Sequence, residues 1–180
     1  MYIGFDISTS ITGVTVIDEN GKMILNESWD TRKYKSFFKK ASVIAENIEE
    51  LSVSFSGNRE KKIFIEQSLQ SFRSGFSSAK TLSTLSRFNG VVSWMLYQAF
   101  GQEPEYIAAP TARKICGVKV PKGTKAKERV LEFVLDSEMD FCLEYTRNGN
   151  PTPEAYDRAD SFIIAKAGYL QCQKQKSEKS

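Results

Sequence analysis

Three short apolar segments joined by tight turns occupy the first 30 residues, and this pattern constrains the fold more than any other feature of the sequence. Residues 2–7, 11–17 and 22–28 show the apolar clustering or alternation of strands, and Asn20-Gly21 is a strong hairpin signal. The remaining residues alternate strand and helix patterns. The sequence therefore predicts an α/β fold with a mixed five-stranded sheet and helices on both faces.

The later elements follow from the spacing of apolar residues and from turn residues. Apolar steps of three and four residues indicate helices, and short apolar runs indicate strands. The predicted helices cover 31–52, 77–100, 111–116, 124–135 and 152 to about 171, and the predicted strands cover 62–66 and 104–108. The 180 residues fit one domain, which we place at 1–172, followed by a disordered tail at 173–180.

Composition excludes several kinds of catalysis. The sequence contains no histidine, which rules out Ser-His-Asp and Cys-His mechanisms and histidine-bound zinc. The three cysteines are widely spaced, so neither a zinc site nor a disulfide framework is expected. No apolar run approaches the roughly 20 residues that span a bilayer, and the N-terminus lacks a signal-peptide pattern. We therefore expect a cytoplasmic protein without a membrane partner, in a bacterium or, if phage-encoded, in the host cell.

Four carboxylates stand at informative positions. Asp6 lies inside an apolar strand, and Glu66 ends another. Asp157 and Asp160 lie three residues apart on the last predicted helix, so they share one face. A buried carboxylate is unfavourable unless it is paired or bound to a metal ion. Each residue alone has a simpler explanation, since Asp6 or Glu66 could belong to a buried ion pair and Asp157 could be a helix-start acid.

The combination of the four carboxylates favours a metal site. Converging carboxylates repel one another unless cations neutralise them. Oxygen ligands without histidine or cysteine favour Mg²⁺ or Mn²⁺ over zinc. Such a cluster suits two-metal phosphoryl-transfer chemistry. We therefore predict that these four residues are catalytic and hold two Mg²⁺ ions, for which Mn²⁺ could substitute.

Basic and aromatic residues surround the predicted site. Between residues 111 and 129, seven Lys and Arg residues accompany one acidic residue, in a chain of net charge +3. This local excess indicates a phosphate-backbone contact, although a solvated helix face would have the same composition. The loop after Glu66 contains two aromatic residues, and loop aromatics either stack on bases or pack down. The predicted nucleic-acid contacts are Phe72, Arg73, Phe76, Lys80, Arg113, Lys119, Lys122, Lys125 and Lys127.

Five segments, in this order, resemble segments of the RuvC-type Holliday-junction resolvases of the ribonuclease H-like superfamily. They are Ile3-Gly4-Phe5-Asp6-Ile7-Ser8-Thr9-Ser10, Ile63-Phe64-Ile65-Glu66, Ser78 to Gly90, Pro121 to Val130 and Tyr156-Asp157-Arg158-Ala159-Asp160-Ser161-Phe162. The resemblance spans most of the chain and extends to phage-borne members. It implies a ribonuclease H-like form of the predicted sheet.

The resemblance also implies an activity and an assembly. It implies a structure-selective DNA endonuclease that resolves four-way junctions by paired incision. The helix over 77–100 would pair two subunits into a homodimer. Asp6 would bridge two Mg²⁺ ions, Glu66 would hold one of them, and Asp157 with Asp160 would hold the other.

Further roles follow for residues beside the carboxylates. Lys122 and Lys125 are assigned to the catalytic site as phosphate contacts near the cut. Phe72 is the first candidate, and Phe76 the second, for a side chain that opens the centre of the junction.

Three alternatives stay open at this point. A related ribonuclease H-like nuclease could cut flaps or RNA/DNA hybrids. A non-catalytic module with the same fold could bind junctions without a metal ion. The segment Asp6 to Ser10 also resembles the first phosphate turn of actin-like ATPases, although those proteins enclose ATP between two such domains.

Overall fold

The computed structural model describes residues 1–57, 60–67 and 79–178. Within these residues the strands are β1 (Tyr2–Asp6), β2 (Ile11–Ile17), β3 (Met23–Asp30), β4 (Lys62–Glu66) and β5 (Glu105–Ile107). The helices are α1 (Phe37–Ser54), α2 (Ala79–Phe100), α3 (Ala109–Cys116), α4 (Ala126–Ser137) and α5 (Pro153–Ser177).

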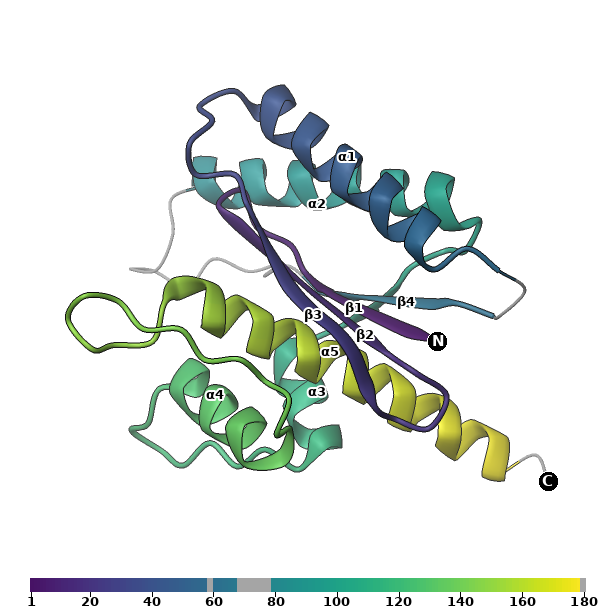
Figure 1. The fold of residues 1–180 in the computed structure, drawn as a ribbon, viewed down its shortest axis with the longest axis vertical. Coiled ribbons are helices and arrows are strands. Elements are labelled where there is room, and N and C mark those ends of the chain that lie inside the picture. Colours follow the sequence, from purple (N-terminus) through teal and green to yellow (C-terminus); the bar gives the residue numbers. More distant parts are fainter. Residues whose placement is uncertain (58–59, 68–78, 179–180) are drawn as a thin grey trace.

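The strands form one sheet in the order β3-β2-β1-β4-β5. The meander β1–β2–β3 is antiparallel, whereas β4 and β5 continue the sheet in parallel with β1. Figure 1 shows α1 and α2 over one face of the sheet and α3, α4 and α5 over the other. The mixed sheet covered on both faces confirms the predicted fold class.

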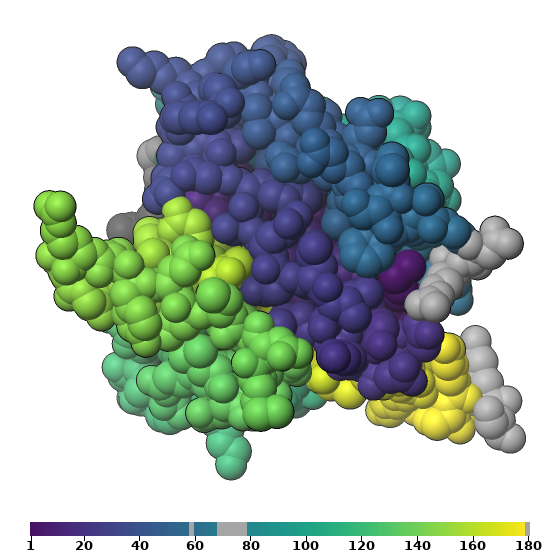
Figure 2. Space-filling view, viewed as in Figure 1, coloured from purple at the N-terminus to yellow at the C-terminus, as the bar shows by residue number. Residues whose placement is uncertain are grey.

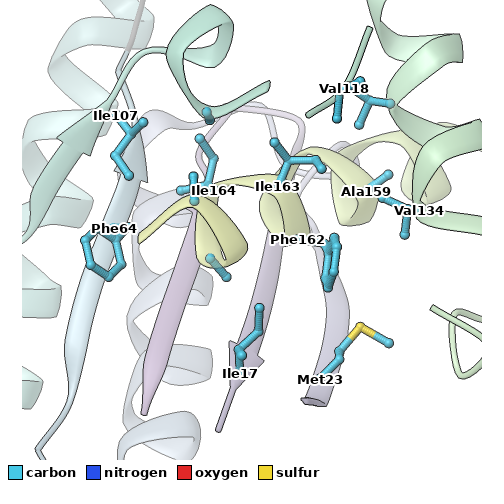
Figure 3. Packing of buried hydrophobic residues seen from close by; sticks show 14 of the residues in the cluster. Ile17, Met23, Phe64, Ile107, Val118, Val134, Ala159, Phe162, Ile163 and Ile164 are labelled. Carbon is cyan, nitrogen blue, oxygen red and sulfur yellow. The ribbon is translucent and has the colours of Figure 1, made fainter. Parts of the chain in front are cut away.

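Two hydrophobic clusters fill the layers on either side of the sheet. The cluster under α1 and α2 includes Phe5, Ile44 and Phe88, which are fully buried. The cluster under α5 includes Phe64 and Phe162, and Figure 3 shows their rings between α5 and the strands. Because both layers are apolar, every strand in the middle of the sheet is buried on both faces, and the ends of these strands become the places where polar side chains reach solvent.

The structure moves the start of α1 away from the predicted position. The helix was predicted from residue 31, but α1 begins at Phe37. Ser36 is the N-cap, and its hydroxyl accepts a hydrogen bond from the main-chain nitrogen of Lys39. The hydroxyl of Thr31 instead donates to carbonyl oxygens of the 9–10 turn. These bonds hold the β3–α1 connection against the end of β1.

The C-terminal end of α5 also differs from the sequence expectation. The helix continues to Ser177, whereas the pattern predicted an end near Gln171 and a disordered tail from 173. Lys174 and Lys176 in the last turn favour this extension, because cations stabilise the C-terminal end of a helix. Thr152 is the N-cap residue, as predicted, but its hydroxyl forms no hydrogen bond within the described residues. None of the helices in the described ranges combines the length and the apolar character that a membrane span requires.

Candidate active site

Asp6 and Glu66 meet at one edge of the sheet because they end neighbouring parallel strands. The parallel pairing of β1 with β4 runs as far as Phe5 and Ile65, and each acid is the next residue along its strand. Both side chains line the same pocket. The carboxyl ends of adjacent parallel strands are a common place for sites in α/β folds.

A glycine lets α5 bring two further carboxylates to this edge. Gly13 lies opposite Asp6 in the β1–β2 ladder. A Cβ atom at Gly13 would lie 2.0 Å from the main-chain oxygen of Asp157, so only glycine allows α5 to approach β2 this closely. As a result Asp6, Asp157 and Asp160 each place a carboxylate oxygen within 4.8 Å of the other two.

Buried polar bonds fix α5 along the sheet. The hydroxyl groups of Thr15 in β2 and Ser161 in α5 lie 2.8 Å apart. The side-chain amide of Asn26 donates to the Thr15 hydroxyl at 2.8 Å and to the main-chain oxygen of Arg158 at 3.1 Å. Since buried polar groups must keep their partners, these bonds specify one register of α5 on the meander. They therefore position Asp157 and Asp160 without touching them.

A lysine from α4 completes the cluster. The Nζ atom of Lys127 donates to Oδ1 of Asp157 at 3.1 Å, and it lies 3.4 Å from Oδ2 of Asp160. The carboxylates are largely buried, with 16% and 11% of their side-chain surface exposed, whereas the lysine side chain is 59% exposed. The ammonium group thus approaches the cluster from the solvent side and neutralises part of its charge.

The carboxylates raise one another's pKa values. Burial raises the pKa of Asp6 well above its ordinary value, and the charges of Glu66 and Asp160 raise it further. Burial raises the pKa of Glu66 to about 7, and Asp160 adds to this shift while Lys127 and Arg113 oppose it. At neutral pH this edge of the sheet therefore favours either protons or cations.

The helix carboxylates follow the same pattern. Burial is the largest cause of the raised pKa values of Asp157 and Asp160, and Lys127 opposes both shifts. Burial alone would lower the pKa of Lys127, but the charges of Asp160, Asp157 and Asp6 raise it above its ordinary value. Lys127 is therefore charged whenever the carboxylates are.

A pocket of about 620 Å³ gives access to the carboxylates. Its walls come from β1 and the turn after it, the β3–α1 connection, α2, α4 and the start of α5. The lining residues are Asp6, Ile7, Ser8, Ser10, Ile11, Arg32, Glu66, Leu85, Asn89, Lys127, Pro151, Pro153, Tyr156 and Asp157. A pocket of this volume is within the usual range of ligand-binding sites.

The donor set fits a divalent cation bound by oxygen. Three carboxylate oxygens lie within 4.8 Å of one another, close to the span of opposite ligands around an ion with bond lengths of about 2.1 Å. No histidine exists in the chain, and the cluster contains no cysteine. Asp6, Asp157 and Asp160 could therefore hold such a cation, and Glu66 lines the same pocket.

The structure separates the predicted basic residues into two groups. Lys127 and Arg113 are close enough to act on the carboxylates, as the pKa shift of Glu66 shows. Lys119, Lys122 and Lys125 lie exposed between α3 and α4, and Nζ of Lys125 pairs with Glu128 at 2.8 Å. Lys80 is exposed at the start of α2. Phe72, Arg73 and Phe76 lie outside the described residues.

Several pocket residues have roles that sequence reasoning did not assign. Lys127 was predicted as a nucleic-acid contact but not as a partner of the carboxylates. Arg32 and Tyr156 were not predicted at all. Asn89 could have been found from the sequence, because it is a polar residue on the otherwise apolar, buried face of α2.

The fold resembles that of solved Holliday-junction resolvases. RuvC of Thermus thermophilus in complex with a Holliday junction substrate aligns with a TM-score of 0.67 at 14% identity, over 96% of this chain and 94% of that one. Another Thermus thermophilus RuvC structure gives 0.64 at 17% identity, over 96% and 95%. The yeast mitochondrial Holliday junction resolvase Ydc2 gives 0.56 at 15% identity, over 98% and 82%. Comparison with protein-family models and with curated protein sequences gives no match.

The chain therefore has a ribonuclease H-like fold. The arrangement of its elements is similar to that of the RuvC structures, and the likeness extends over nearly the whole chain.

Proposed function

We propose that this protein is a metal-dependent endonuclease that resolves four-way DNA junctions. The observation that carries the proposal is the convergence of Asp6, Asp157 and Asp160 in a pocket that Glu66 also lines. The RuvC structure to which the chain is similar holds a Holliday junction substrate, which supports this choice of DNA. Burying several carboxylates beside an apolar sheet costs folding free energy, and such clusters are typical of functional sites.

The four carboxylates would hold two Mg²⁺ ions, with Mn²⁺ as a substitute. Asp6 would contact both ions, Glu66 one of them, and Asp157 with Asp160 the other. Ions bound in this way supply a reactive water and stabilise the charge that develops on the phosphodiester.

The chain's own basic residues would bind and orient the DNA. Lys127 lies on the solvent side of the carboxylates, where its ammonium group can contact the scissile phosphate. Arg113 acts on the same edge from α3. Lys122 and Lys125, exposed before α4, stay proposed phosphate contacts near the cut. The proposed contacts of Lys80 and Lys119 and of the 72–76 segment stay predictions from the sequence.

A homodimer is the proposed assembly, because paired incision requires two sites. Within the described residues, α2 exposes Trp94 and Tyr97, whose rings lie 5.7 Å apart. Phe38 on the neighbouring α1 is 74% exposed. Exposed aromatic residues grouped on adjacent helices are typical of protein interfaces. A cytoplasmic location, in a bacterium or in the host of a phage, stays a prediction from the sequence.

The proposal is tested with labelled four-way, flap, RNA/DNA hybrid and linear duplex substrates, each with and without Mg²⁺. Junction cleavage that requires Mg²⁺ and is lost in Asp6→Asn supports it. Asp136→Asn is the matched control, because Asp136 is an exposed acid of α4 away from the pocket. Preferred cleavage of flaps or hybrids would instead assign a related nuclease activity. Metal-independent junction binding that survives Asp6→Asn, without any cleavage by the unaltered protein, would assign a binding module.

A further inference from the structure

A second basic surface lies on the opposite wall of the pocket from Lys127. It consists of the β3–α1 connection and the first turn of α1, and we call it the α1 basic surface. Its members are Arg32, Lys33, Lys35, Lys39 and Lys40. In the view of Figure 2, the dark blue atoms of this part of the chain lie directly above the yellow-green atoms at the start of α5.

The surface is fastened to the turn that follows Asp6. Nζ of Lys40 donates to the main-chain oxygen of Thr9, and the hydroxyl of Thr31 donates to the same oxygen at 3.1 Å. Arg32 lines the active-site pocket and forms ion pairs with Asp30 at 2.7 Å and with Glu154 of α5. The position of the surface relative to the carboxylates is therefore set by direct contacts with the walls of the pocket.

Two lysines of this surface are placed against helix stability, and among the described residues three of its exposed lysines lack an acidic partner. Lys39 and Lys40 stand in the first turn of α1, which contains no acidic residue. The N-terminal end of a helix carries partial positive charge, so lysines there are unfavourable and acids are preferred. Within the described part of the chain, Lys33, Lys35 and Lys39 form no ion pair with a carboxylate. The local charge pattern is thus the opposite of what folding alone favours, which is typical of functional positions.

The ring of Tyr34 lies close to two of these lysines, Lys33 and Lys39. Nζ of Lys33 lies 5.0 Å from the ring centroid of Tyr34, and Nζ of Lys39 lies 5.9 Å from it. Both contacts are within the range of cation–π attraction. The ammonium groups therefore stay near one another instead of dispersing into solvent, which concentrates positive potential beside the pocket.

We propose that the α1 basic surface binds the phosphate backbone of a double-stranded arm of the DNA substrate. This inference rests on the proposed function. The α1 basic surface would provide a second set of phosphate contacts, in addition to those of Lys127 and the 111–129 segment across the pocket. A duplex held on both sides presents one phosphodiester to the carboxylates in a fixed orientation. The lysines make no base contact in this role, so they contribute affinity and position but no sequence preference.

The test uses the triple variant Lys33→Gln, Lys35→Gln, Lys39→Gln in the Asp6→Asn background, so that DNA is bound but not cut. Affinity for a labelled four-way junction and for a linear duplex is measured by fluorescence anisotropy without metal over a series of salt concentrations. Each lost phosphate contact lowers the slope of log K against log salt by about 0.9. We expect the slope to fall by about 2 to 3, and the Kd at low salt to rise about tenfold or more.

The control variant carries Lys22→Gln, Lys174→Gln and Lys176→Gln. It removes the same charge from exposed lysines in the β2–β3 turn and at the C-terminal end of α5, at the other end of the molecule in Figure 1. We expect its slope to stay close to that of the Asp6→Asn parent. The melting temperature of the α1 triple variant should equal or exceed the parent's, because its helix start loses unfavourable charge.

The outcomes separate the two proposals. A parent protein that binds neither junction nor duplex would overturn the proposed function. A parent that binds both, with equal salt slopes in the α1 triple variant and in the control, would overturn the role of the α1 basic surface and leave the proposed function standing.

Discussion

The ammonium group of Lys127 lies 3.1 Å from Oδ1 of Asp157, on the solvent side of a largely buried carboxylate cluster. The contact joins α4, which carries the lysine, to α5, which carries the acid. The flexible Lys127 side chain thus contacts the same carboxylate oxygens that would bind a metal ion. Lysine and metal ion compete for the same oxygens, and this competition leads to the first prediction.

Replacing Lys127 with Met should lower the stability of the metal-free protein by about 1 kcal/mol, because an ion pair that is more than half exposed contributes little more. The same variant should gain more stability from added Mg²⁺ than the unaltered protein, since the ion no longer displaces an ammonium group. Thermal unfolding over a Mg²⁺ titration measures both effects. Lys125→Met, which affects an exposed pair, is the control. Equal Mg²⁺ responses in the two variants would contradict the competition.

The raised pKa of Glu66 predicts an unusual dependence of stability on pH. The folded protein holds the Glu66 proton up to about pH 7, whereas the unfolded chain releases it near 4.5. The folded state therefore binds more protons between these values, and the free energy of unfolding should fall as the pH rises from 4.5 through 7. The fall is at most about 3 kcal/mol for this residue, and Asp6 acts in the same direction.

Denaturant unfolding without metal at a series of pH values measures this fall. Glu66→Gln should show a shallower fall and a higher stability at pH 8 than the unaltered protein. Glu49→Gln, an exposed acid of α1, should keep the full pH dependence. Mg²⁺ should restore stability at pH 8 in the unaltered protein. A stability that rises across this interval would show that the buried carboxylates are not held in their neutral form.

Even the small substitution Gly13→Ala should sharply reduce stability and cleavage. A methyl group at this position meets the Asp157 main chain at 2.0 Å, so Gly13→Ala must push α5 away from β2. We expect a destabilisation of about 1–3 kcal/mol and a loss of cleavage greater than the loss of folded protein explains. Gly90→Ala is the control, because a methyl group there meets no atom within 4 Å and the helix interior favours alanine. Urea unfolding and cleavage assays on both variants decide the point.

The exposed Trp94 on α2 allows a test of the proposed dimer interface. Replacing this residue, which is 62% exposed on α2, with Asp should place a charge in the proposed dimer interface and shift the protein toward monomers. Tyr145→Asp changes an equally exposed aromatic residue outside α2 and should leave the assembly unchanged. Sedimentation velocity at several protein concentrations compares the two. Dimers that persist in Trp94→Asp, or a protein that is monomeric before any change, would rule out this face.

The sequence predicted those parts of the site that depend on local patterns. Asp6 was recognisable as an acid inside a short apolar strand and Glu66 as an acid that ends another, and the ends of adjacent parallel strands share an edge. Asp157 and Asp160 were recognisable because three residues on a helix place them on one face. The mixed sheet followed in the same way from the hairpin signal and the alternation after it.

The parts that escaped prediction depend on contacts between distant segments. Lys127 reaches the carboxylates because α4 packs against α5, and nothing in its spacing distinguishes it from Lys122 or Lys125. The start of α1 was placed too early, at residue 31, although the apolar periodicity begins only at Phe37, where the helix starts. The hydrogen bond from Thr31 to the 9–10 turn holds the preceding stretch outside the helix. In both places a contact between segments far apart in the sequence decides the structure.

The first strand and the last helix of the described chain meet in the pocket, since Asp6 comes from β1 and Asp157 from α5. A ribosome must therefore release α5 before the pocket can assemble, whatever has already folded. Until then the nascent polypeptide holds at most two of the four carboxylates, Asp6 and Glu66, in place. Under the proposed function, a chain still being synthesised thus lacks a complete cleavage site.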